Sequence, residues 1–233
     1  MMAIGSGAQE EILEQIKLVG VNNIVITPIV KQEEKQLEAS ESGEGAEKNL
    51  SQGLSLYDTR SIEKIVPGIE KLSPEIIIET YLIKNALRRS AKLVGVENSY
   101  FDISGFELSE GKFFNSDHMA EGKPVCIIGK SIKSKFFSKE EPIGKYIKVG
   151  NHWLKVIGVL EERHISQKSI SNLGIRDYNM DVYTPFKTVL FRYENRLLVT
   201  EAGIKLFNGT DPEERENTNY HQLDRLVVQV NKL

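Results

Sequence analysis

The sequence contains one cysteine, Cys126, and no apolar run as long as a membrane-spanning helix requires. A single cysteine excludes an intramolecular disulfide, and its place inside the apolar run 124–128 predicts a small buried core residue rather than a nucleophile. The N-terminus also lacks a signal-peptide pattern, since neither a basic start nor an apolar segment is present. Taken alone, these absences would describe a soluble cytoplasmic protein.

Positive charge is not in excess either. The chain has 30 Lys and Arg against 33 Asp and Glu, a net charge of −3. Nucleic-acid binding needs a concentrated basic face, so no nucleic-acid partner is expected. The one basic cluster is expected to be the solvated face of a strand pair. It consists of Lys84, Arg88, Arg89 and Lys92.

Side-chain groupings that carry out chemistry are missing as well. The histidines lie far apart without the spacing of metal ligands, and no Walker-type phosphate loop is present. The adjacent pairs Glu140-Glu141 and Glu161-Glu162 make poor acid–base dyads, because neighbours on a strand point to opposite faces. We therefore expect no catalytic residue, no metal, no cofactor and no enzyme. The histidines are His118, His152, His164 and His221.

What is present is an ordinary globular composition, with 40% hydrophobic and 27% charged residues over 233 positions, enough for one large domain or two modest ones. Glycosylation sequons occur at Asn49-Leu50-Ser51 and Asn208-Gly209-Thr210, although such short matches arise by chance.

The central part of the chain predicts a strand, a helix and a hairpin. The run 124–128, closed by Gly129, reads as a buried strand, and 131–137 as a short helix whose Ile132, Phe136 and Phe137 face that strand. After a turn at 142–145, the segments 146–149 and 153–159 are β-rich. Gly150-Asn151 between them supplies the positive φ of a tight turn.

Before this block, Ser6 and Gln9 form a capping box for an amphipathic helix over 6–19, and 24–29 reads as a strand that Pro28 pushes to an edge. Segment 31–52 is polar and acidic, which predicts a flexible surface loop.

Order resumes at Leu54. Asp58 is expected to cap a short helix with Ile62, Ile65 and Val66 facing inward. Strands are expected at 69–73, 76–83 and 91–96, with a polar connection over 85–89, and a brief helix or turn over 100–108.

Towards the C-terminus, 163–178 reads as a loop, 181–183 as a strand, and Thr184-Pro185 as the start of a helix through Arg192, with proline at the first helical position. Segment 195–222 reads as a polar insertion. The alternating pattern of 225–230 predicts a strand that returns to the sheet of the first strands.

One ordered set of motifs resembles a known family. The order is Gly-x-x-Phe, an acidic loop, Val-x-Ile-Ile-Gly, a helix ending in Phe-Phe, Pro-Ile-Gly-Lys, Val-Ile-Gly-Val-Leu, and later Asp-Val-Tyr-x-Pro-Phe. It is similar to the extracytoplasmic domain of the macrolide-exporter (MacB-like) ABC transporter permeases. That domain lies between the first two membrane spans, which implies the periplasmic portion of a bacterial inner-membrane protein.

The resemblance implies an α+β fold with two subdomains. Residues 1–104 plus 223–233 would form a membrane-proximal, porter-like subdomain with a strand–helix–strand unit, and 105–222 an inserted, sabre-like upper subdomain, mainly β with short helices. Family members continue past the last strand with a helix and one further strand. This sequence stops at Leu233, so an uncovered sheet edge is expected.

The function implied is that of an efflux permease domain, which transmits ATP-driven motion and docks a periplasmic adaptor for export of a drug, peptide or other small substrate. Implied partners are a cytoplasmic ATPase domain or subunit, an outer-membrane channel and a second permease copy, with the isolated fragment monomeric. Two alternatives remain: a lipoprotein-releasing or cell-division-type permease domain, or a free-standing extracellular binding module.

Overall fold

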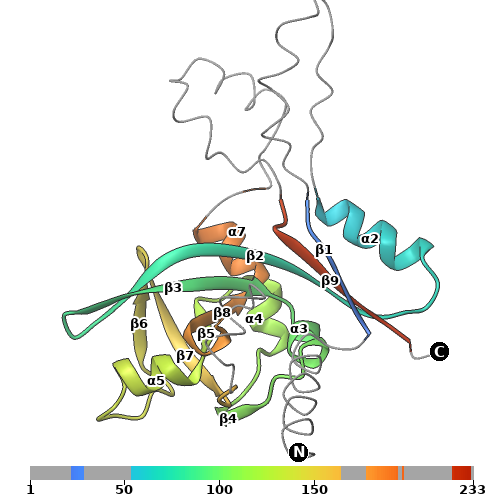
Figure 1. Cartoon of the computed structure of the whole chain (residues 1–233). Helices are drawn as coiled ribbons and strands as arrows, with labels where there is room; N and C mark the ends of the chain where they lie inside the picture. The colour runs from blue at the N-terminus through green and yellow to red at the C-terminus, as the bar shows by residue number, and fades with distance from the viewer. Residues whose placement is uncertain (1–21, 29–53, 164–176, 194–195, 197–221, 232–233) are drawn as a thin grey trace, which may run out of the picture.

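Nine β-strands in one connected sheet dominate the computed structural model, which describes residues 22–28, 54–163, 177–193, 196 and 222–231 (Figure 1). The strands are β1 Asn23–Ile26, β2 Ile69–Lys84, β3 Leu87–Val96, β4 Leu108–Gly111, β5 Val125–Ile128, β6 Tyr146–Val149, β7 His152–Leu160, β8 Asp181–Pro185 and β9 Arg225–Val230. The helices are α2 Leu56–Ile65, α3 Asn98–Ile103, α4 Ser116–Glu121, α5 Lys130–Phe136 and α7 Phe186–Arg192, with a 3-10 turn η2 at Tyr178–Met180. This mixed, sheet-dominated architecture agrees with the expected α+β class.

The strand order divides the described part into two regions. Strands run β1-β9-β2-β3-β8-β5-β7-β4, and β6 pairs with both β2 and β7. These pairings close a circuit of β2, β3, β8, β5, β7 and β6, which we call the six-stranded ring. We call β1, β9, residues 69–75 of β2 and helix α2 the arm, which lies to the right of the ring in Figure 1.

Strand β2 belongs to both regions. Its first half pairs with β9 as far as Glu75, and its pairing with β3 begins at Ile76. The prediction of two strands, 69–73 and 76–83, is wrong, since a single strand of 16 residues runs through. Pro74, which has no N–H to donate to a ladder, lies just before the point where pairing with β9 on one side of β2 ends and pairing with β3 on the other side begins.

The two hairpins follow their turn chemistry. Gly150 has φ 54° and joins β6 to β7 as predicted. The polar connection predicted over 85–89 is wrong, because the turn is only Asn85-Ala86, with φ of 49° and 63°. Two residues with positive φ are what a type I′ hairpin turn requires, so Arg88 and Arg89 lie within β3.

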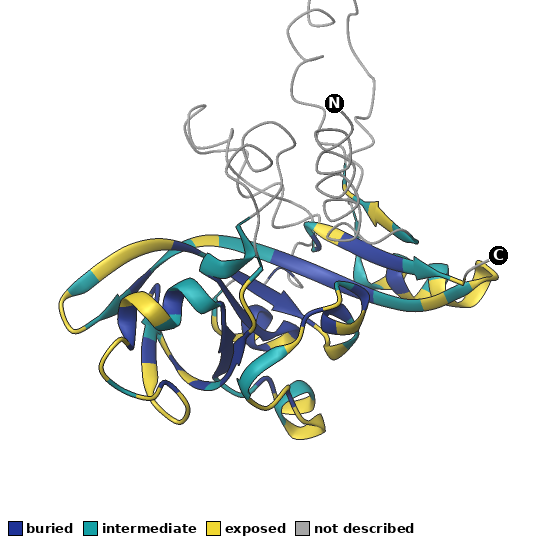
Figure 2. Cartoon of the chain, turned by 60° about the horizontal axis from the view of Figure 1, so that its bottom comes forward, coloured by how far each residue is buried: buried dark blue, intermediate teal, exposed yellow. Residues whose placement is uncertain are grey.

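The interior of the ring is apolar, and much of the ribbon of its strands is coloured as buried in Figure 2. Cys126 of β5 is fully buried there, as predicted, and Ile132, Phe136 and Phe137 pack from α5 and its C-cap onto the same cluster, also as predicted. A second cluster of aromatic rings includes Tyr100, Phe101, Phe106 and Tyr183. Arg163 lies over the ring of Phe106 at 4.1 Å from its centre.

Helix α2 differs from its prediction in two ways. Its N-cap is Ser55, and Asp58 is instead the third helical residue of a capping box, accepting a hydrogen bond from the Ser55 backbone N–H at 2.9 Å. Ile65 and Val66 do not face inward, since they are 78% and 47% exposed. The prediction fails because the helix face that α2 buries is the one that carries Thr59.

The segment between β3 and β5 is more ordered than predicted. Residues 100–108 divide into the end of α3 and the start of β4, and the expected acidic loop contains α4, capped by Asn115. Pro185 is the N-cap of α7 rather than its first helical residue.

The last strand is confirmed in place, since β9 pairs antiparallel with both β1 and β2. Strand β1 ends the strand order on that side, so in the described part of the chain it forms a sheet edge. The predicted helix over 6–19, the loop over 31–52 and most of 163–178 and 195–222 lie outside the described residues.

Candidate functional site

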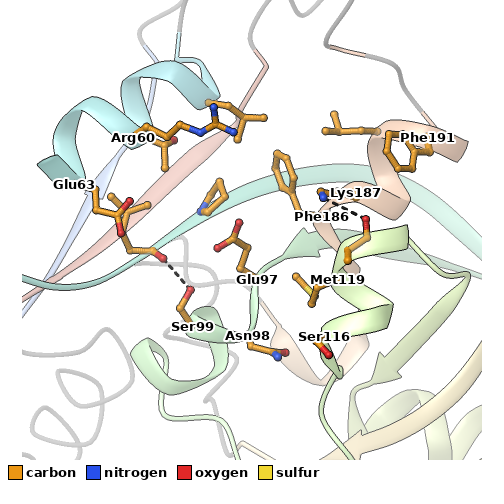
Figure 3. A pocket seen from close by; sticks show the side chains of 16 residues that line it. Arg60, Glu63, Glu97, Asn98, Ser99, Ser116, Met119, Phe186, Lys187 and Phe191 are labelled. Carbon is orange, nitrogen blue, oxygen red and sulfur yellow. Dashed lines mark hydrogen bonds between the residues drawn. The ribbon is translucent and has the colours of Figure 1, made fainter.

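A cleft of about 780 Å³ lies between the arm and the ring. Helix α2 forms one side, the N-terminal end of α3 and helices α4 and α7 form the other, and β2 contributes Leu72 and Pro74 (Figure 3). Apolar and polar side chains line the cleft in about equal measure, and its volume falls within the range of cavities that bind small ligands.

The apolar lining comes mainly from two helices. Met119 of α4 and Phe186, Leu190 and Phe191 of α7 line the ring side of the cleft. Phe186 and Leu190 are almost fully buried, whereas Phe191 is 63% exposed and lies at the mouth of the cleft. The ring side therefore offers an apolar surface that continues from the core to solvent.

Four charged side chains also line the cleft: Arg60 and Glu63 from α2, Glu97 at the start of α3, and Lys187 from α7. Lys187 donates a hydrogen bond to the carbonyl of Ala120 at 3.2 Å. Glu97 is the N-cap of α3 but makes no capping hydrogen bond, so its carboxylate stays directed into the cleft (Figure 3). Both signs of charge are thus present within one cavity.

The environment raises the pKa of Glu97 above its ordinary value. Burial in the cleft is the main cause, since it disfavours the charged form, and the nearby Glu63 carboxylate acts in the same direction. Lys187 partly opposes this shift. A second carboxylate or an apolar ligand brought next to Glu97 would shift its pKa further in the same direction.

Hydrogen bonds between chain segments fix the rim of the cleft. Ser99 Oγ donates to the carbonyl of Leu72, Asn98 Nδ2 to that of Phe114, and Thr188 Oγ1 to that of Lys123, each at 2.8 Å. Helix α2 is tied to the C-terminal part of the chain, since the N–H of Leu56 donates to Gln222 Oε1 at 3.2 Å. The Ser99–Leu72 bond also links the ring side of the cleft to the arm.

The chemistry this arrangement supports is binding. The exposed carboxylates of Glu63 and Glu97 and the cations of Arg60 and Lys187 lie beside apolar side chains, a combination suited to holding a ligand that is partly polar and partly apolar. Within the described residues, no group of three or more His, Cys, Asp or Glu side chains is arranged to hold a metal ion.

The histidines singled out from the sequence do not meet in this cleft. The His118 Nδ1 accepts from the N–H of Asn115 in the cap of α4, and His152 packs against Tyr193 with ring centres 4.7 Å apart. His164 and His221 lie outside the described residues.

The other flagged groups are structural too. Glu140 forms an ion pair with Lys84, and this hydrogen bond lowers the pKa of Glu140. Burial raises the pKa of the Cys126 thiol, which makes it inert. Arg88 and Arg89 are exposed as expected, but neighbouring residues on β3 face opposite sides. Both sequons fall outside the described residues.

Sequence reasoning missed the residues that line the cleft. Glu63, Glu97 and Lys187 come from three separate elements, and none belongs to a motif. The only local hint is that Glu97 follows directly on the buried strand end Val94-Gly95-Val96. Such sites depend on the fold, because the side chains meet only when β2 and β3 bring α2, α3 and α7 together.

Among the described residues, no helix is both long and apolar enough to cross a membrane.

Known proteins similar to this chain are export permeases. It is 26% identical over 191 residues to the "Macrolide export ATP-binding/permease protein MacB" of Aggregatibacter actinomycetemcomitans, covering 82% of this chain and 27% of that protein. It is 26% identical over 215 residues to a MacB of Aeromonas hydrophila, covering 91% of this chain and 30% of that protein. The chain thus spans less than a third of the length of these relatives.

Solved structures support the fold. The periplasmic region of MacB from Actinobacillus actinomycetemcomitans matches with a TM-score of 0.62 at 19% identity, covering 95% of this chain and 80% of that one. The extracellular domain of the noncanonic ABC-type transporter YknZ from Gram-positive bacteria matches with a TM-score of 0.58 at 18% identity, covering 90% and 84%. At these identities the likeness concerns the fold alone.

A family model decides the assignment. The model of the MacB-like periplasmic core domain matches residues 1–217, almost the whole sequence. The resemblance, the fold class and the periplasmic location expected from the sequence are confirmed, and the chain belongs to the family of MacB-like periplasmic core domains.

Proposed function

We propose that this chain is the periplasmic domain of an ABC-type efflux permease, and that its task is mechanical. ATP-driven motion on the cytoplasmic side reaches the domain through membrane helices, and the domain docks a periplasmic adaptor during export of a drug, peptide or other small substrate. The observation that carries the proposal is the family match over residues 1–217, together with relatives named as macrolide export permeases.

The remaining partners are proposed on the same ground. They are a cytoplasmic ATPase domain or subunit, a second copy of the permease and an outer-membrane channel. In this proposal ATP hydrolysis belongs to a part of the protein outside this chain, and the domain itself is not catalytic. Purified alone, the chain is expected to sediment as a monomer.

The pairing of β2 supports a mechanical role. One half of this strand pairs with β9 in the arm and the other half with β3 and β6 in the ring. In the two-subdomain division, with residues 1–104 plus 223–233 below and 105–222 above, β2 lies in the lower part, and its pairing with β6 connects it to the upper part. A displacement of the arm would therefore reach the ring as a rigid-body movement.

That movement would change the width of the cleft, because its two sides belong to different regions. Arg60 lies on α2 in the arm and Lys187 on α7 beside the ring, and both are exposed. A change in the angle between arm and ring would alter the distance between these side chains.

The test uses the full-length permease carrying Arg60→Cys and Lys187→Cys, joined by a short bifunctional maleimide. Cys126 is fully buried and does not compete for the reagent. We expect the cross-link to abolish coupled export in proteoliposomes while ATP hydrolysis continues. Each single-cysteine variant treated in the same way is the control. Normal export by the cross-linked protein would rule out the proposed coupling movement.

A further inference from the structure

A second surface lies on the outside of the ring, across four neighbouring strands. Strand pairing places Ile83 of β2 between Arg88 of β3 and Lys148 of β6. Lys148 in turn lies directly opposite Trp153 of β7. Directly opposed residues point to the same face, so these four side chains form one row about 14 Å long, since neighbouring strands lie about 4.8 Å apart.

Flanking residues two positions along each strand extend this row. Tyr81 precedes Ile83, and the guanidinium of Arg88 lies over the Tyr81 ring at 3.9 Å from its centre. Tyr146 and Lys155 lie opposite each other on β6 and β7. We call the whole set the Trp153 face. Its members are Tyr81, Ile83, Arg88, Tyr146, Lys148, Trp153 and Lys155.

The aromatic residues of this face are unusually open. Trp153 is 56% exposed and Tyr146 54%, although the residues next to them, Leu154 and Ile147, are fully buried in the ring. Large aromatic side chains on a surface leave apolar area in water, and tryptophan, tyrosine and arginine are the residues that dominate binding energy at protein interfaces.

The charge of the Trp153 face is opposite to that of the chain. The whole chain carries −3. Beside the face, Lys92 is paired with Glu79 at 3.2 Å. Arg88, Lys148 and Lys155 form no ion pair with any residue that the structure describes. Three cations without carboxylate partners thus surround an aromatic centre.

We propose that the Trp153 face docks an acidic protein segment, whose carboxylates meet Arg88, Lys148 and Lys155 and whose apolar side chains cover Ile83 and Trp153. The inference rests on the proposed function, which gives this domain a protein partner in its own compartment. Charge complementarity selects an acidic partner. The row alternates cationic and apolar residues at the spacing of neighbouring strands. A protein segment can use both kinds of residue, whereas a polyanion such as a polysaccharide would contact the cations alone.

Trp153 provides the readout, because it is the single tryptophan of the sequence. The probe is a short synthetic peptide in which glutamate and leucine alternate, titrated into this chain at neutral pH. We expect a saturable blue shift of the emission of Trp153 as the peptide covers it, with an affinity that falls as salt is added. A peptide with lysine in place of glutamate should give no shift.

Charge reversals then locate the site. Arg88→Glu and Lys148→Glu are each expected to weaken peptide binding about tenfold, as loss of a close charge pair does. The matched control is Arg89→Glu, which makes the same change one position along β3. Arg89 lies opposite Leu82 and points to the other side of the strand, so its reversal should leave the affinity unchanged. Circular dichroism confirms that each variant is folded.

Four results would overturn the proposal. They are the absence of a saturable shift, an equal loss of affinity in Arg89→Glu, equal binding of heparin or phosphatidylglycerol vesicles, and a shift that follows protein concentration without peptide. Equal binding of heparin or vesicles would identify a general polyanion site, and a shift that follows protein concentration without peptide would identify self-association. Failure here leaves the cross-linking result on the full-length permease unaffected, so the two proposals are tested separately.

Discussion

The arm and the ring are built from similar residues but bury them differently. In the ring, β-branched and aliphatic side chains such as Ile127, Leu154 and Val182 are fully buried. In the arm, Ile24 and Val25 of β1 are 51% and 48% exposed. The difference follows from strand position, since every strand of the ring has a neighbour on both sides, whereas β1 ends the strand order of the described residues; β9 beside it still buries Leu226 and Val228. Composition alone does not distinguish the two regions.

The largest expected effect comes from truncating an apolar residue in each region. Leu154→Ala removes a fully buried side chain of the ring core, and should lower the free energy of unfolding by about 2–5 kcal/mol. Ile65→Ala shortens a side chain that is 78% exposed, and should change it by less than about 0.5 kcal/mol. Urea titrations of both variants measure the contrast. Similar losses would mean that the arm buries Ile65 in solution.

Glycine substitutions sharpen the same contrast at the backbone. A Cβ at Gly129 would lie 2.4 Å from the carbonyl oxygen of Asn179, a backbone atom that cannot move aside alone. Gly129→Ala is therefore expected to cost about 3 kcal/mol. Gly68, at the end of the arm, has φ 86° and open space around it. Gly68→Ala should cost only the left-handed strain of about 1 kcal/mol, measured by the same urea titration. Equal costs would contradict the close approach at Gly129.

The smallest effect concerns the boundary between the regions, where Glu97 lies. Because its pKa is raised in the folded state, the unfolded chain loses this proton more readily. Stability therefore falls as pH rises from the ordinary carboxyl pKa through the higher folded value. Glu97→Gln removes this contribution, so the variant should lose less stability over that window. Urea titrations across a pH series measure the difference.

A second carboxyl variant separates the two causes of this shift. Glu63→Gln removes the neighbouring charge but keeps the burial, which is the larger cause. It should leave most of the pH dependence in place. Parallel pH profiles for the wild type and Glu97→Gln would contradict a raised pKa at this position.

The sequence predicted elements wherever a local signal and the tertiary structure agree. Gly150 supplied the positive φ of the β6–β7 turn, the run 125–128 became a buried strand, and Ile132 and Phe136 faced the core from α5. In each case the turn residue or the apolar spacing lies within a few positions of the element it determines.

Prediction failed where partners distant in sequence decide the outcome. Two strands were predicted over 69–73 and 76–83, yet β2 is continuous because β9 pairs with it up to Glu75 and β3 pairs with it from Ile76. The spacing of Ile62, Ile65 and Val66 suggested one inward face, but α2 buries Thr59 and leaves Ile65 and Val66 exposed. The cleft was not predictable at all, because its charged residues meet only through the tertiary fold.

The pairing of β1 with β9 has a consequence for biosynthesis. Ile26 lies opposite Leu226 and Asn23 opposite Gln229, so the arm joins the first and last strands of the described chain. A nascent chain can close the ring before β9 has been synthesised, but β1 cannot pair until β9 is present. Contacts between residues so distant in sequence also form slowly. We therefore expect the arm to assemble last during synthesis and export of the chain, which leaves β1 as the strand most in need of protection by a chaperone until then.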